Sequence, residues 1–273
     1  MKKFKIDSIT EVILVNNDWV VLENGTPQAS MPRSLYKYFS LNNFSIDNLQ
    51  NDYIYLSNPK DFNDPFDCNR NLIIEKQKQL RNWQYVEQLN DISDIGIASF
   101  SEYGMEPLLW SHYANSYRGF CIKFNLESLI KSQNDSVKLK KVIYSDSPQV
   151  ISEKHPFSNY YHYLLKLKNW NYESEWRLLF ENPRNTENRF YFDKSCIEEI
   201  SLGYKISDTT SEKERELYDT FNKIKKERFS DVPLMTVEPH QTKLELKKMM
   251  LKEGTYEDAM EMIKNNFGFL FNK

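Results

Sequence analysis

The sequence predicts an α+β fold in which small mixed or antiparallel sheets are flanked by helices. Short runs rich in β-branched and aromatic residues occur among helical patterns without a regular βαβ repeat, which argues against a doubly wound parallel sheet. Only 7 of the 273 residues are glycine, and neither G-x-G-x-x-G nor G-x-x-x-x-G-K-[ST] is present. The glycine-dependent Rossmann and P-loop nucleotide sites are therefore excluded, and function has to be argued from individual sites.

The composition is that of a globular protein with nearly balanced charge. There are 36 Lys and Arg residues against 39 Asp and Glu, so the formal net charge is -3, without the basic excess typical of proteins that grip nucleic acid or anionic membranes. The three cysteines are widely spaced and form no C-x-x-C motif, which predicts a reducing, cytoplasmic location and no cysteine-based zinc site. No signal peptide or membrane-spanning run is expected.

The N-terminal segment is predicted to be an extension of the main domain. Residues 9–23 contain two β-rich runs around a polar turn, which is the pattern of a β-hairpin, and residues 24–32 predict a linker. We therefore expect a hairpin extension over residues 1–30 and a single α+β domain, ending in helices, over residues 31–273.

The remaining elements follow from hydrophobic periodicity, with a period of two for strands and 3.6 for helices. Strands are expected at residues 35–39, 53–56, 95–101, 119–125, 140–144 and 169–181. Helical segments are expected at residues 45–50, 75–88, 105–117, 157–168 and 211–229, and after residue 255. Pro107 suits the first turn of its helix.

The cleanest alternation lies in residues 169–181. It places Glu173, Glu175 and Arg177 on one face of a single strand. Two carboxylates at this spacing lie about 7 Å apart along a strand, which suits the gripping of one polar ligand at two points. A carboxylate also stabilises the positive charge that develops when a glycosidic bond breaks. The alternative is that Arg177 pairs with Glu175 on a solvated strand face.

A second polar motif is Asn63-Asp64-Pro65-Phe66-Asp67. Asx residues before proline initiate turns by bonding their own backbone, so the segment is either a structural turn or the lip of a pocket with Asp64 and Asp67 as ligand contacts.

Two further candidates lie on other predicted elements. The hydroxyls of Ser99 and Ser101 point to one side of their strand, where they could hold a ribose or a carboxamide. His112, two residues after Trp110 on a predicted helix, is either a packing residue or a ligand contact. We expect no metal, because no spacing requires His112 to converge with the acidic residues.

Six segments together resemble a bacterial family of proteins of unknown function. The most specific are FNDPFD at residues 62–67 and W-x-YE-x-EWR at residues 170–177. The others are LYKYFS (35–40), ASFSE (98–102), LLWSHYANSYRGFCIKFN (108–125) and VIYSD (142–146). The resemblance runs in order over about residues 33–205 and supplies no activity.

The order of three strands is similar to that of the ADP-ribosyltransferase superfamily. In that superfamily the first strand offers Arg, His or Tyr to NAD, the middle strand Ser or Tyr, and the last strand the catalytic glutamate. The resemblance implies that Glu175 is catalytic and that Glu173 assists the acceptor. The sequence departs from the pattern because its first strand has no Arg or His. The residues expected to contact substrate or NAD are Tyr36, Tyr38, Ser99, Ser101, Asn63, Asp64, Asp67, Trp110, His112 and Arg177.

These inferences predict an ADP-ribosyltransferase-like enzyme that cleaves the nicotinamide bond of NAD and transfers ADP-ribose to a protein or nucleic acid, as a toxin or anti-phage defence effector. One alternative is a non-catalytic sensor, in which the FNDPFD, Trp-His and YESEWR segments form a pocket for a nucleotide or a protein. Another is a metal-dependent nuclease or phosphohydrolase that uses Asp64, Asp67, His112 and Glu173.

Overall fold

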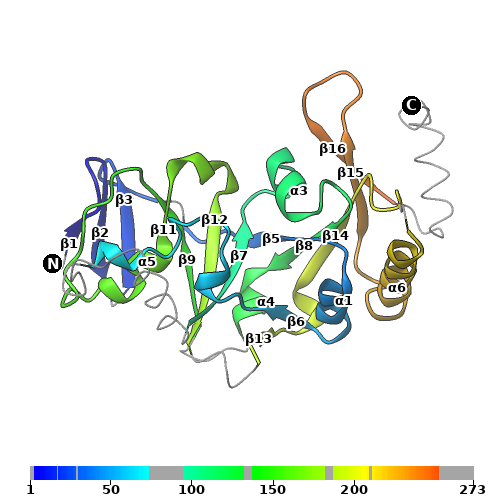
Figure 1. Ribbon diagram of the computed structural model, residues 1–273, viewed down its shortest axis with the longest axis horizontal. Helices are drawn as coiled ribbons and strands as arrows, with labels where there is room; N and C mark the ends of the chain where they lie inside the picture. The colour runs from blue at the N-terminus through cyan, green and yellow to red at the C-terminus, as the bar shows by residue number, and fades with distance from the viewer. Residues whose placement is uncertain are drawn as a thin grey trace. The chain divides into compact units, whose positions relative to one another are not determined.

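The computed structural model describes residues 3–16, 18–28, 30–73, 95–131, 137–181, 187–208 and 211–251 (Figure 1). It has the predicted α+β class, with several antiparallel and mixed sheets and few helices in the described chain. The chain divides into two compact units, each assembled from three stretches. Unit 1 comprises residues 1–32, 55–100 and 133–190, and unit 2 comprises residues 33–54, 101–132 and 191–273.

In its described residues, unit 1 contains an N-terminal antiparallel sheet, a three-strand group and one α-helix. The N-terminal sheet has the order β1 (Lys3–Lys5), β2 (Thr10–Val15), β3 (Asp18–Glu23) and β4 (Thr26–Pro27). The three-strand group has the order β7 (Ile95–Ser101), β12 (Glu175–Glu181) and β9 (Val137–Lys141). The other elements are α5 (Ser158–Leu164), β10 (Ile143–Tyr144), β11 (Leu165–Lys166), and the short 3-10 helices η1 (Pro59–Asp61), η2 (Arg70–Leu72) and η4 (Lys168–Glu173).

The predicted N-terminal hairpin is confirmed as β2 and β3. The expected linker is partly wrong, because Thr26 and Pro27 form β4 against the end of β3. Ile6 and Val12 are fully buried and share a hydrophobic core with Phe157 and Tyr161. The N-terminal sheet therefore contributes side chains to the core of unit 1.

Unit 2 is built on five strands in the order β16 (Leu246–Met250), β15 (Leu234–Pro239), β14 (Ile197–Gly203), β8 (Phe120–Asn125) and β5 (Ser34–Phe39). Strands β14 and β15 run parallel, and the other three pairs are antiparallel. The helical segments in the described part of unit 2 are α1 (Asn43–Gln50), α3 (Pro107–Tyr113), α4 (Leu126–Lys131), η6 (Lys194–Cys196) and α6 (Glu212–Arg228). Strands β6 (Tyr53–Tyr55) and β13 (Arg189–Tyr191) lie where the chain passes from one unit to the other.

Helices cover both faces of the sheet in unit 2. Successive side chains of a strand point to opposite faces, so Phe120 and Cys121 of β8 face different layers. Phe120 contacts Phe221 of α6 with ring centroids 5.0 Å apart, while Cys121 packs with Trp110 of α3. Figure 1 shows α3 on one side of these strands and α6, beside α1, on the other.

Two predicted helices end earlier than expected. Helix α3 stops at Tyr113 because Asn115, Ser116 and Tyr117 have left-handed backbones, with φ values of 46°, 53° and 70°. Helix α5 stops at Leu164, and the next two residues form β11, which runs parallel to β10. The predicted helix over residues 75–88 and the one after residue 255 lie outside the described residues.

The longest described helix, α6, has 17 residues and is dense in charge. None of the helices in the described part of the chain has the combination of length and apolar character that a bilayer crossing requires.

Gly203 is required by a close backbone approach in unit 2. Its N–H donates to the carbonyl oxygen of Gly119, and a Cβ added to Gly203 would lie 2.3 Å from the carbonyl oxygen of Tyr117. We expect Gly203→Ala to lower the free energy of unfolding by about 1–3 kcal/mol or more, because the backbone must shift. Urea unfolding measures the loss. Gly25→Ala is the control: its φ of 77° is strained for alanine, but its surroundings are open, so only about 1 kcal/mol should be lost. Equal losses would contradict the steric argument.

Candidate functional site: a buried charge network

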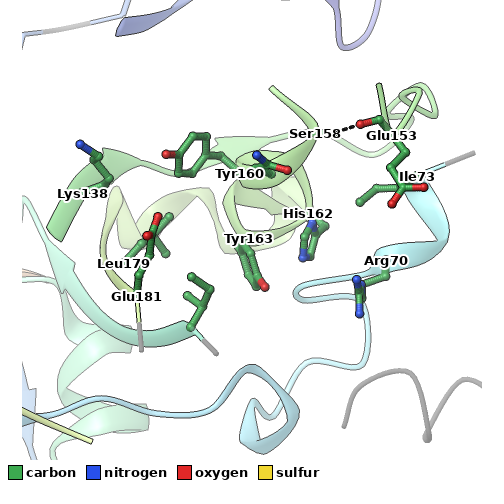
Figure 2. A pocket seen from close by; sticks show the side chains of 12 residues that line it. Arg70, Ile73, Lys138, Glu153, Ser158, Tyr160, His162, Tyr163, Leu179 and Glu181 are labelled. Carbon is green, nitrogen blue, oxygen red and sulfur yellow. Dashed lines mark hydrogen bonds between the residues drawn. The ribbon is translucent and has the colours of Figure 1, made fainter. Parts of the chain in front are cut away.

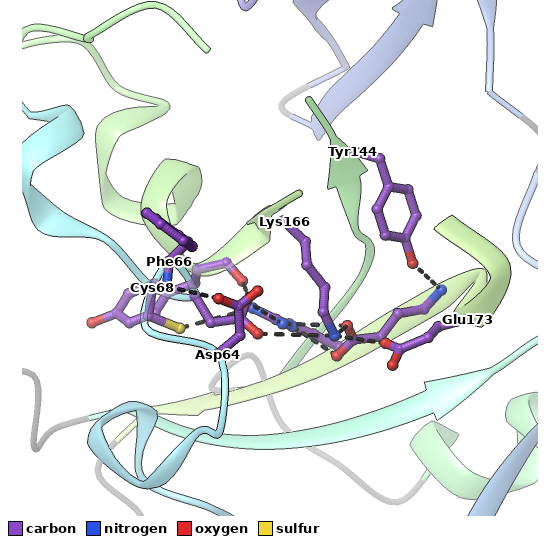
Figure 3. A network of polar contacts seen from close by, with 10 residues as sticks. Asp64, Phe66, Cys68, Tyr144, Lys166 and Glu173 are labelled. Atoms are coloured by element: carbon purple, nitrogen blue, oxygen red, sulfur yellow. Dashed lines mark hydrogen bonds and ion pairs between the residues drawn. The ribbon is translucent and has the colours of Figure 1, made fainter. Parts of the chain in front are cut away.

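Five charged side chains form a buried charge network in unit 1 (Figure 3). They are Asp67, Lys166, Glu173, Glu175 and Arg177, and none is more than 7% exposed. Asp67 belongs to the FNDPFD segment, and the last three belong to the YESEWR segment. The two most specific sequence motifs therefore bind each other.

Arg177 is the centre of the charge network and is fully buried. Its Nε donates to Glu175 Oε1 at 2.8 Å, and its Nη2 donates to Asp67 Oδ1 at 2.7 Å and to Glu175 Oε2 at 3.2 Å. Its Nη1 donates to the Tyr163 carbonyl oxygen at 2.8 Å and contacts the Cys68 sulfur at 3.8 Å. Each of the five N–H groups of the guanidinium thus has an acceptor, which is what makes burial of this charge tolerable.

Lys166 bridges the two glutamates. Its Nζ donates to Glu173 Oε2 at 2.6 Å and to Glu175 Oε2 at 2.9 Å, and it lies 5.1 Å from the centroid of the Trp170 ring. Burial alone would lower the pKa of Lys166, but the neighbouring carboxylates raise it. The polar group that the two glutamates grip together is therefore a charged lysine of the same chain.

Three carboxylates face two cations, so the charge network would bury one excess negative charge if every member were ionised. Burial raises the pKa of Glu175, but Arg177 and Lys166 lower it more strongly, to about 2. For Asp67 the effect of burial outweighs the attraction of the same two cations, and its pKa is raised. The raised pKa of Asp67 and the lowered pKa of Glu175 are compatible. A proton bound to Asp67 removes the excess negative charge and leaves Glu175 ionised.

The backbone around the glutamates differs from the prediction. Residues 168–173 form the 3-10 helix η4, Ser174 is left-handed with φ 41°, and β12 begins only at Glu175. Glu173 and Glu175 therefore do not alternate along one strand, and their meeting depends on the reversal at Ser174 and on Lys166. The alternative of a solvated strand face is also wrong, because the Arg177–Glu175 pair is buried.

The site residues predicted on β5 and β7 make contacts that are separate from one another. In unit 1, Ser99 of β7 hydrogen-bonds the Glu175 side chain. In unit 2, Ser101 lies directly opposite Tyr36 of β5. Tyr38 donates its hydroxyl to the Tyr103 carbonyl oxygen at 2.7 Å.

Of the remaining predicted site residues, Trp110 and His112 belong to unit 2, and Asn63 and Asp64 belong to unit 1. Trp110 is fully buried in unit 2 and donates its ring N–H to the Gly104 carbonyl oxygen at 3.1 Å. His112 is exposed on the same helix. In unit 1, Asn63 is exposed, and buried Asp64 accepts from the Phe66 N–H at 2.9 Å, which is the turn contact that the motif predicts. The roles of Trp110, His112, Asn63 and Asp64 as ligand contacts stay predictions.

Sequence reasoning missed Lys166 and Tyr144. The N–H of Glu175 donates to the Tyr144 hydroxyl oxygen at 2.8 Å, and Figure 3 shows both side chains reaching the glutamates from one side. A lysine enclosed by the apolar run YYHYLLKL was the available signal, since a charge there needs a buried partner.

Among the residues that the structure describes, no group of three or more His, Cys, Asp or Glu side chains is arranged to hold a metal ion.

Comparison with known proteins gives one family. The family described as a protein of unknown function (DUF2971) matches residues 109–178, about a quarter of the chain. The matched stretch includes the Trp-His helix and the YESEWR segment but not FNDPFD. It supports the resemblance to a family of unknown function. No curated protein and no solved structure matches the chain.

Two substitutions at Asp67 test the charge balance. Asp67→Ala removes an acceptor from buried Arg177 and should cost about 3–5 kcal/mol of unfolding free energy. Asp67→Asn keeps an acceptor oxygen and removes the excess charge, so it should cost less than about 1 kcal/mol. Urea unfolding at pH 7 compares them. Similar losses in the two variants would show that Asp67 has to be ionised.

The lowered pKa of Glu175 predicts a specific acid dependence. A carboxylate whose folded pKa of about 2 lies below its ordinary value of 4.5 stabilises the fold fully above about pH 4.5, and this stabilisation is lost as the pH falls toward 2. The difference in unfolding free energy between the wild type and Glu175→Gln should therefore shrink over that range. Denaturant titrations at several pH values measure it, and a difference that does not change with pH would contradict the assignment.

Proposed function

We propose that the protein is an ADP-ribosyltransferase-like enzyme that uses NAD as substrate and Glu175 as its catalytic residue, with a protein or nucleic acid as acceptor, in the manner of a toxin or defence effector. The observation that carries the proposal is the environment of Glu175. Its carboxylate is ionised at neutral pH, lies at the start of β12, and is held by Arg177 against Ser99 of the neighbouring strand.

This environment suits the bond that would be broken. When the bond between nicotinamide and ribose breaks, its electron pair leaves with nicotinamide, and the anomeric carbon gains positive charge until an acceptor nucleophile attacks it. An ionised carboxylate that accepts a hydrogen bond from the ribose 2-hydroxyl stabilises that charge. Glu173, on the other side of Lys166, would help to take the proton that the acceptor loses.

Two contacts support the proposed order of strands. Ser99 hydrogen-bonds Glu175, as a middle-strand serine beside the catalytic glutamate would. Ser101, two residues later, pairs with Tyr36 of the strand proposed to come first.

The same geometry defines what the substrate must displace. Glu175 Oε1 accepts from Arg177, while Oε2 is shared by Lys166 and Arg177. A ribose hydroxyl would take the place of Lys166 on Oε2, and Arg177 would continue to hold Oε1. Lys166 would then retain Glu173 as its partner.

Nicotinamide release tests the proposal. The purified protein is incubated with NAD alone and with mixed protein, DNA or RNA acceptors, and label transfer from the adenylate moiety is followed in parallel. We expect Glu175→Gln to reduce nicotinamide release by at least about 100-fold, as loss of one electrostatic stabiliser does in other enzymes.

A matched control separates catalysis from stability. Glu198 is a hydrogen-bonded carboxylate of unit 2 whose pKa is also lowered to about 2, against the effect of burial, by Asn125, Ser34 and Lys123. Glu198→Gln should keep full activity at temperatures where both variants are folded by circular dichroism. Equal turnover in Glu175→Gln and the wild type would remove Glu175 from the mechanism.

A second candidate is a non-catalytic sensor of nucleotides or proteins. It is favoured by one observation: Glu175 is only 3% exposed, and both of its oxygens contact cations of the same chain. A sensor should be stabilised by its ligand without converting it. A rise in melting temperature with NAD, but no nicotinamide release with any acceptor, would select this function over transfer.

A further inference from the structure

A pocket of about 290 Å³ lies in unit 1, beyond the charge network on the same face of β12 (Figure 2). Side chains at alternate positions of a strand share a face, so Leu179 and Glu181 continue the row that begins with Glu175 and Arg177. Leu179 and Glu181 line the pocket. The other lining residues come from α5, β7, β9, the segment around η2 and Glu153. Neither the proposed transfer reaction nor the sequence motifs use this pocket.

The charges that line the pocket cancel. Figure 2 shows Arg70 and Glu153 at one side of the pocket and Lys138 and Glu181 at the other. Glu153 and Glu181 are exposed, while Arg70 and Lys138 are half-buried. Two cations and two carboxylates leave no net field that would attract a strongly charged ligand. They do supply hydrogen-bond donors and acceptors at both sides.

The interior of the pocket is aromatic and apolar. His162 and Tyr163 are buried, and their ring centroids lie 3.8 Å apart with the planes tilted by 41°. Leu179 is buried beside them, and half-buried Tyr160 belongs to the same helix. Asn159, an exposed residue that also lines the pocket, offers an amide that can both donate and accept. Aromatic side chains with a few polar groups are the composition of a small-molecule site.

We propose that this pocket binds a nucleoside. The base would pack against the aromatic side chains, with its polar edge toward Asn159, and the ribose hydroxyls would donate to Glu153 or Glu181. The volume is near the lower end for small-molecule sites, which fits one nucleoside and not a whole dinucleotide. The cancelled charges disfavour a phosphate. The site is therefore separate from the proposed NAD site at Glu175.

Binding to the full chain is measured by thermal shift and calorimetry. The probes are adenosine, guanosine, cytidine and uridine, each beside its 5′-monophosphate. At least one nucleoside should raise the melting temperature by about 2 °C or more at millimolar concentration. It should bind at least 10-fold more tightly than its monophosphate. Binding of none of the four, or equal binding of the monophosphate, would overturn the proposal.

Variants of Tyr160 place the binding in this pocket. Tyr160→Ala should weaken the nucleoside at least 10-fold, while Tyr160→Phe, which keeps the ring, should stay within about 3-fold of the wild type. Tyr103→Ala removes a 51% exposed tyrosine of unit 2 and should leave binding unchanged. Unaltered binding in Tyr160→Ala would show that the nucleoside binds elsewhere. Nicotinamide release by Glu175→Gln tests only the transferase proposal, and nucleoside binding by the Tyr160 variants tests only the pocket. Either proposal can therefore fail without the other.

Discussion

The burial of Arg177 is the constraint on which the rest of unit 1 depends. A fully buried guanidinium is tolerated only if its donors are satisfied, and its acceptors come from three separate segments: the turn at Asp67 and Cys68, the carbonyl of Tyr163 at the end of α5, and Glu175 on its own strand. One side chain therefore fixes the positions of segments separated by up to 110 residues. Apolar packing alone would hold them with less directional precision.

The charge network also sets the chemical state of its members. Lys166 is protonated because its carboxylate neighbours raise its pKa, so it acts as a positioning cation and not as a nucleophile. Burial raises the pKa of Cys68 to about 12, so the thiol is neutral at physiological pH. Glu175 is ionised at neutral pH, because the two cations lower its pKa to about 2. This distribution suits electrostatic stabilisation of a developing positive charge, which is why a transferase is proposed before other reaction classes.

One strand face of unit 1 contains two different environments. At its beginning, Glu175 and Arg177 are buried among charges that compensate one another. Two residues after Arg177, buried Leu179 lines the pocket, and exposed Glu181 lines it as well. Tyr163 links the two environments, because its carbonyl oxygen accepts from Arg177 while its side chain lines the pocket. A ligand in the pocket would therefore contact a residue that helps to hold the charge network.

The sequence by itself determined the α+β class, most of the strands, and the segments from which the charge network is built. Strand periodicity is a local property, which is why residues 95–101 and 35–39 were placed correctly. The tertiary structure decided how those segments meet. The pairing of Asp67 with Arg177 is a long-range contact that the fold creates. The left-handed backbone of Ser174, which interrupts the expected strand between Glu173 and Glu175, is also a property of the folded chain. The sequence does not reveal which residues pair with Lys166. A buried ion pair is recognisable only after folding has brought its members together and excluded water from them.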